Sequence, residues 1–118
     1  MQYLLMIYTN ETEGAAMSKG DLEKLHRDYV EFTQAIVKAG QFKAGDRLRP
    51  TSMATTVRVR NGKTLTTDGP FAETREQLGG YYLVEAKDLD EATGIAARIP
   101  AARHGSIEVR PIWPMDMK

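Results

Sequence analysis

The chain has no cysteine among its 118 residues. This absence excludes a disulfide scaffold, a thiolate nucleophile, a zinc ribbon and an iron–sulfur cluster, because each of them needs cysteine sulfur. Histidine is scarce as well: His26 and His104 are the only two, and they lie far apart in the sequence. With scattered carboxylates and no ligand spacing, we expect neither a metal nor another cofactor, and haem would have to rest on His26 alone.

The sequence also lacks an excess of charge and a long apolar run. Sixteen Lys and Arg balance sixteen Asp and Glu, so no overall field favours nucleic acid or an anionic membrane. No stretch approaches the roughly 18 apolar residues of a membrane span. The apolar run at 4–7 has no basic flank and no cleavage site, unlike a signal peptide. We therefore expect a cytoplasmic protein with no direct nucleic-acid partner and no membrane association.

What is present is the composition of one ordinary globular domain spanning 1–118, with 42% hydrophobic and 27% charged residues. Residues 2–9 are apolar without alternation, which is typical of a strand covered on both faces. Ser18 and Asp21 have the spacing of a helix start, and apolar residues then recur at helical intervals up to Gly40. A second helix is predicted from Asp88 until the chain reaches Pro100.

Further strands are predicted at 41–48, 81–84 and 107–112, and residues 55–60 and 63–67 flank Asn61-Gly62 as a hairpin with a two-residue turn. Without this hairpin the order is βαββαβ, so the predicted fold class is α+β, of the ferredoxin-like kind with an inserted β-hairpin. Both helices then cover one face of the sheet. Because residues 2–9 and 81–84 are apolar on both sides, the second face needs a cover, and a face-to-face homodimer supplies one.

The segment 68–82, Asp-Gly-Pro-Phe-Ala-Glu-Thr-Arg-Glu-Gln-Leu-Gly-Gly-Tyr-Tyr, resembles the signature of the DGPF-domain proteins within the YCII-related family. The apolar first strand ending in Tyr8, Ala39-Gly40 after the long helix, residues 56–58 before Asn61-Gly62, and residues 108–111 support the resemblance. It implies a dimeric α+β barrel but no established activity. Some related members are proposed enzymes in which a helix histidine and an aspartate face a pocket. Others lie beside, or are fused to, extracytoplasmic-function sigma factors.

The resemblance implies catalytic candidates in His26, on the long helix, and Asp68, in the signature. A shift of three positions along the helix would put Tyr29 in the histidine's place instead. From the residues alone, a neutral imidazole on the buried side of the helix or its border is suited to general-base chemistry when a carboxylate orients it. The alternatives are a border histidine without chemistry and an aspartate that accepts hydrogen bonds within a turn.

Candidate ligand-binding residues follow from charge placed on one side of a strand or after a turn. Arg58 and Arg60 share one face of their strand, where two guanidinium groups would hold a small anion. Glu73, Arg75 and Glu76 follow Asp68 in the sequence and would present further charged groups to a cleft beside the sheet. A solvated strand face and ordinary surface ion pairs are the competing interpretations.

The leading functional hypothesis is a homodimer that binds a small polar or anionic metabolite in a cleft beside the sheet. Acid–base chemistry by His26 and Asp68 would make it an enzyme, a point that the residues leave open. The alternative is a non-catalytic accessory protein associated with a sigma factor or another transcriptional regulator. A purely structural dimer is compatible with the same residues.

Overall fold

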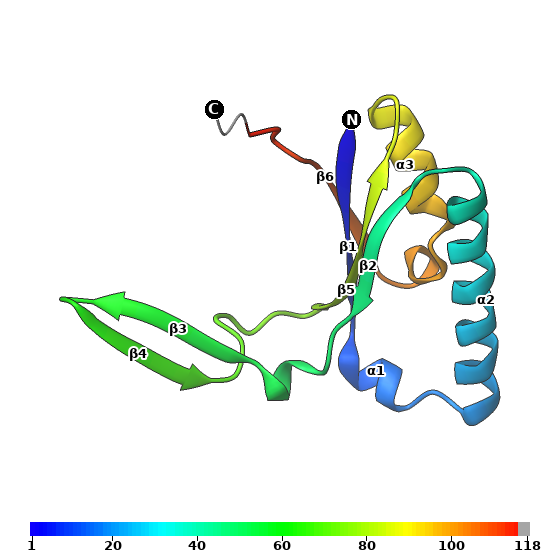
Figure 1. Ribbon diagram of the computed structural model, residues 1–118. Coiled ribbons are helices and arrows are strands. Elements are labelled where there is room, and N and C mark those ends of the chain that lie inside the picture. The colour runs from blue at the N-terminus through cyan, green and yellow to red at the C-terminus, as the bar shows by residue number, and fades with distance from the viewer. Residues whose placement is uncertain (116–118) are drawn as a thin grey trace.

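Four strands form one antiparallel sheet in the computed structural model, which describes residues 1–115 (Figure 1). Their order across the sheet is β2 (Phe42–Arg47), β5 (Gln77–Glu85), β1 (Gln2–Thr9) and β6 (Ser106–Pro111). The two central strands, β5 and β1, are the third and first strands of the βαββαβ order, so this is the predicted ferredoxin-like arrangement. The predicted α+β class is confirmed.

Two helices, α2 (Lys19–Lys38) and α3 (Leu89–Arg98), cover one face of the sheet (Figure 1). Both begin where the sequence predicts. Ser18 Oγ accepts a hydrogen bond from the backbone nitrogen of Asp21 at 3.1 Å, and the Asp88 carboxylate accepts one from that of Glu91 at 2.9 Å. These side chains satisfy backbone N–H groups that the first helical turn leaves unpaired. Gly40 ends α2 with a φ of 74°, a conformation that glycine adopts without strain.

The core lies between these helices and the covered face of the sheet. Alternate residues of β1 point into it, as expected for a strand with a period of two. Its largest fully buried side chains are Leu5, Ile36, Val84 and Ile99. No helix within residues 1–115 is long and apolar enough to cross a membrane.

The other face of the sheet has no helix over it in the described part of the chain (Figure 1). Leu4 pairs with Leu83, and Met6 pairs with Tyr81, so these four side chains share this side at the centre of the sheet. We call it the open face. Its members on the four strands are Gln2, Leu4, Met6, Tyr8, Ala44, Asp46, Leu78, Tyr81, Leu83, Glu85, Ser106, Glu108 and Arg110.

The predicted hairpin is present as β3 (Thr55–Arg60) and β4 (Lys63–Asp68), a two-stranded sheet of its own. Its turn has positive φ at both central residues, 51° at Asn61 and 73° at Gly62, as a two-residue turn of this sequence requires. The hairpin projects away from the body on the side of the open face, opposite α2 (Figure 1).

Three short elements were not predicted: α1 (Glu11–Ala15) and the 3₁₀ turns η1 (Thr51–Met53) and η2 (Pro100–Arg103). Strand β5 also begins four residues earlier than predicted, at Gln77, because the adjacent residues Gly79 and Gly80 lie within the strand. The pairing of β1 with β5 shifts between Ile7 and Tyr8, opposite these glycines. A Cβ on Gly80 would lie 2.9 Å from the carbonyl oxygen of Asp46, so glycine allows the close approach of β2.

Candidate functional site

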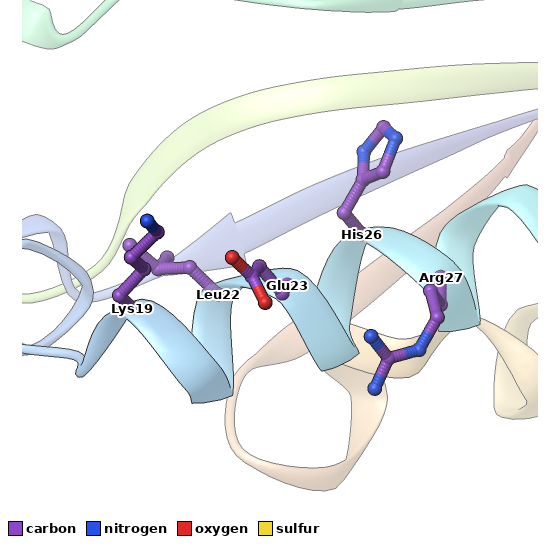
Figure 2. A pocket seen from close by; sticks show the side chains of 5 residues that line it. All are labelled: Lys19, Leu22, Glu23, His26 and Arg27. Carbon is purple, nitrogen blue, oxygen red and sulfur yellow. The ribbon is translucent and has the colours of Figure 1, made fainter.

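His26 lies on an exposed part of α2, next to two surface hollows. The larger hollow measures about 450 Å³, and Lys19, Leu22, Glu23 and Arg27 line it together with His26 (Figure 2). All five belong to one helix, and Figure 2 shows the His26 and Arg27 side chains directed to different sides of it. The expectation that His26 lies on the buried side of the helix or its border is therefore corrected. Side chains that diverge from one helix do not enclose a ligand.

A better enclosed polar cluster lies between α2 and the covered face of the sheet. The hydroxyl groups of Thr33 and Tyr82 are 2.7 Å apart, and the Tyr82 ring packs edge-on against Phe32 at 5.1 Å. Burial raises the pKa of Tyr29 to about 12, and the charge of Tyr82 acts in the same direction, while the Ala101 backbone and Arg47 oppose it. The sequence analysis considered Tyr29 as an alternative at the position of the helix histidine, but it took Tyr82 only as an apolar residue and missed this cluster.

Asp68 is placed at the base of the hairpin, where β4 ends. Within one chain the structure does not bring it to His26, because the hairpin and α2 lie on opposite sides of the sheet (Figure 1). Among the described residues its exposed carboxylate has no hydrogen-bond donor. The turn is held instead by backbone groups: Gly69 N donates to Ala54 O at 2.7 Å, and Thr56 Oγ1 donates to Gly69 O at 2.8 Å.

Arg58 and Arg60 lie on the hairpin, and its register defines two faces with different chemistry. Thr55 pairs with Asp68, and Arg58 pairs with Leu65, so paired residues share a side and alternate along the ribbon. We call the first side the valine face, which consists of Thr55, Val57, Val59, Thr64 and Thr66, with Asp68 at its base. The second is the arginine face, which consists of Thr56, Arg58, Arg60, Lys63, Leu65 and Thr67. Asp68 and the two arginines therefore point to opposite sides of the hairpin.

The signature residues after Asp68 connect β4 to β5. The carboxylate of Glu76 accepts a hydrogen bond from Ser106 Oγ at 2.8 Å, and the carbonyl of Arg75 accepts one from Asn10 Nδ2 at 3.1 Å. The side chains of Glu73 and Arg75 are exposed and form no ion pair within residues 1–115. Glu76 is thus held at the end of the sheet, apart from the arginine face, and the structure does not assemble all the predicted binding residues in one cleft.

The open face carries two polar pairs that the sequence did not single out as pairs. Tyr81 Oη donates to Asp46 at 2.7 Å, and this hydrogen bond raises the pKa of Tyr81. On β6, the edge strand opposite β2, Arg110 Nη2 lies 2.7 Å from Glu108 Oε2. The two pairs border the apolar centre of the face.

The chemistry that these groups offer is hydrogen bonding and charge pairing. No cluster of histidine, aspartate and glutamate that would suit a metal ion occurs within residues 1–115. The described side chains also include no histidine in hydrogen-bonding contact with a carboxylate, which general-base chemistry by an oriented imidazole would need.

Comparison with known proteins agrees with the sequence resemblance. The model of the YCII-related domain matches residues 1–116, nearly the whole chain. An uncharacterized protein of Rhizobium meliloti (strain 1021) is 41% identical over 114 residues, which cover 95% of this chain and 92% of that protein. The family has the dimeric α+β barrel architecture, and the α+β fold with its antiparallel four-stranded sheet fits it. The chain belongs to the YCII-related family.

Proposed function

We propose that two copies of the chain pair through the open face and that the resulting dimer binds a small anionic or polar metabolite beside the sheet. The observation that carries this proposal is a sheet with one face covered by helices and the other bare but apolar at its centre, at Leu4, Met6 and Leu83. A contact with twofold symmetry lets such a patch pack against its own copy. The two polar pairs that border this apolar centre would form the polar rim that such interfaces carry.

The arginine face supports the anionic character of the ligand. Arg58, Arg60 and Lys63 place three cations on one side of the hairpin, and none of them forms an ion pair within residues 1–115. Guanidinium groups bind carboxylates and phosphates through paired hydrogen bonds, which makes them suited to small anions. The proposal includes no acid–base step by His26 and Asp68, since these residues lie on opposite sides of the sheet in one chain.

A thermal-shift screen of phosphate and small mono- and dicarboxylates tests the binding. A ligand at 100 times its dissociation constant adds about 2.7 kcal/mol to the free energy of unfolding. We expect this stabilisation in the wild type and its loss in the double variant Arg58→Ala/Arg60→Ala. Arg27→Ala is the matched control, because it removes a cation from α2 on the other side of the sheet. If Arg27→Ala abolishes the shift and the double variant keeps it, the ligand binds beside His26 and the proposed location is wrong.

Two exposed aromatic side chains favour the accessory role as a second candidate function. Phe71, in the signature, is 80% exposed, and Trp113 is 88% exposed. Aromatic residues are enriched where proteins bind other proteins. If the chain contacts a sigma factor or another regulator in this way, Phe71→Ala and Trp113→Ala will weaken that complex in a pairwise binding assay without altering ligand-induced thermal shifts.

A further inference from the structure

The hairpin formed by β3 and β4 is exposed on both of its faces in a single chain. Val57 and Val59 keep 59% and 60% of their surface exposed, and Leu65 on the other side keeps 47%. Within residues 1–115 its strands pair only with each other. A two-stranded hairpin without a packed face is at best marginally stable in water, so this arm needs a surface that the described part of its own chain does not supply.

The two faces of the arm differ in what such a surface would have to accommodate. Apart from Asp68 at its base, the valine face carries only valine and threonine. The arginine face carries three cations, whose burial without partners would be costly. The valine face is therefore the side suited to packing, and the arginine face is the side suited to water or to an anion.

The position and the length of the arm favour a second copy of this chain as the surface that covers the valine face. The arm leaves the body on the same side as the open face (Figure 1). Packed sheets lie about 10 Å apart, whereas six residues of strand extend about 20 Å. An arm of this length reaches past the sheet of a copy seated on the open face and arrives beside that copy's helices.

The arms would enlarge the contact between two copies. Each arm adds one side of a two-stranded ribbon to the contact, and it covers a matching patch on the partner. The interface would therefore bury more surface with the arms than through the open faces alone.

We infer that the valine face of each hairpin packs against the body of a second copy of the chain, so that each subunit holds the other with an arm while the arginine face stays free. The inference rests on the proposed dimer. It goes beyond that dimer by assigning the hairpin, with Val57 and Val59 as anchors, to the contact between subunits.

Paired aspartate substitutions on the two faces test the inference by analytical ultracentrifugation. Val59→Asp would bury a carboxylate in the contact and is expected to weaken dimerisation by at least about tenfold. Leu65→Asp, which makes the same change of charge on the arginine face of the same ribbon, should alter the dimer dissociation constant by less than about threefold. A monomeric wild type would overturn the proposed dimer itself. A dimeric wild type that Val59→Asp leaves equally tight would overturn only the role of the arm.

The absence of cysteine allows a second test that does not depend on a variant's stability. A benzophenone photocrosslinker is attached to Val59→Cys or, as the control, to Arg58→Cys, and labelled chains are mixed with ¹⁵N-substituted chains. Mass spectrometry then distinguishes links between chains from links within one chain. We expect links between chains from position 59 and far fewer from position 58. Equal yields, or only links within a chain from position 59, would contradict the inference.

Discussion

The carboxylate of Glu11 binds the start of η1 through Thr51, forty residues further along the chain. The backbone nitrogen of Thr51 donates to the two carboxylate oxygens of Glu11 at 3.1 and 3.2 Å, and the Thr51 hydroxyl donates to Glu11 Oε2 at 3.2 Å. In addition, Gln77 Oε1 accepts from the Glu11 backbone nitrogen at 2.9 Å. One residue of the unpredicted helix α1 therefore joins the segment before the hairpin to the first residue of β5.

Removing this carboxylate should destabilise the fold. We expect Glu11→Ala to lower the free energy of unfolding by about 1–3 kcal/mol, because partly buried donors lose a charged acceptor. Glu13→Ala is the control: Glu13 lies in the same helical turn but is exposed, so its loss should cost no more than about 0.5 kcal/mol. Urea denaturation measures both values, and equal effects of the two substitutions would contradict this role of Glu11.

The register of β1 separates two adjacent leucines. Leu5 is fully buried in the core, whereas Leu4 lies on the open face opposite Leu83. We expect Leu5→Asp to abolish folding, since it buries an unpaired carboxylate at a cost of several kcal/mol. Leu4→Asp should act through the dimer, so that the chain sediments as a monomer of reduced stability. A Leu4→Asp protein that stays dimeric at micromolar concentration would show that the open face is not the interface.

Gly69, which precedes Pro70, has a φ of 102°, in the left-handed region that favours glycine. A Cβ there meets no atom within 4 Å, so substitution is penalised by backbone strain alone. We expect Gly69→Val to destabilise by about 1–3 kcal/mol. Gly94→Ala is the control, because this exposed position in α3 also has space for a Cβ. Alanine favours the helix, so this substitution should raise the free energy of unfolding by up to about 1 kcal/mol. Destabilisation by both substitutions in urea denaturation would argue against strain as the cause.

The raised pKa of Tyr29 predicts a loss of stability in alkali. The folded-state pKa, about 12, lies above the unfolded value. The contribution is therefore fully present below about pH 10 and is lost as the pH rises towards about 12, because only the unfolded chain readily releases the proton. We expect Tyr29→Phe to flatten this decline in urea midpoints measured from pH 9 to 11.5. An equally steep decline in the variant would assign the effect to another group.

Sequence periodicity predicted the sheet, the two long helices and the hairpin because these features depend on local rules. Asn61-Gly62 specifies its turn through positive φ, and Ser18 marks the start of α2 by capping it. Helix α1 was not predicted, because its five residues contain too few turns to show a periodic pattern of apolar residues. Only its cap, Asn10, which accepts from the backbone of Glu13 at 2.9 Å, offered a signal.

The candidate site was harder to predict, since it depends on which elements face each other. Apolar spacing gave the direction of the buried stripe of α2 but not the length over which the sheet covers it. Phe32 and Ile36 are buried, while Leu22, on the same stripe, is 45% exposed. His26 lies in this uncovered first half of the helix. Likewise, the sequence predicted that Asp68 lies at the end of the hairpin that carries Arg58 and Arg60. Only the register shows that Asp68 and the two arginines point to opposite sides of this hairpin.

The hairpin also has a consequence for how the sheet assembles. Strands β2 and β5 are neighbours, yet residues 48–76 separate them along the chain, where a tight turn of a few residues would suffice. Each doubling of such a loop adds about 0.6 kcal/mol to the entropic cost of bringing its ends together, so this insertion adds about 2 kcal/mol. Pairing of β2 with β5 is thereby changed from a local event into a distant one. The insertion is therefore expected to slow the pairing of these two strands during folding.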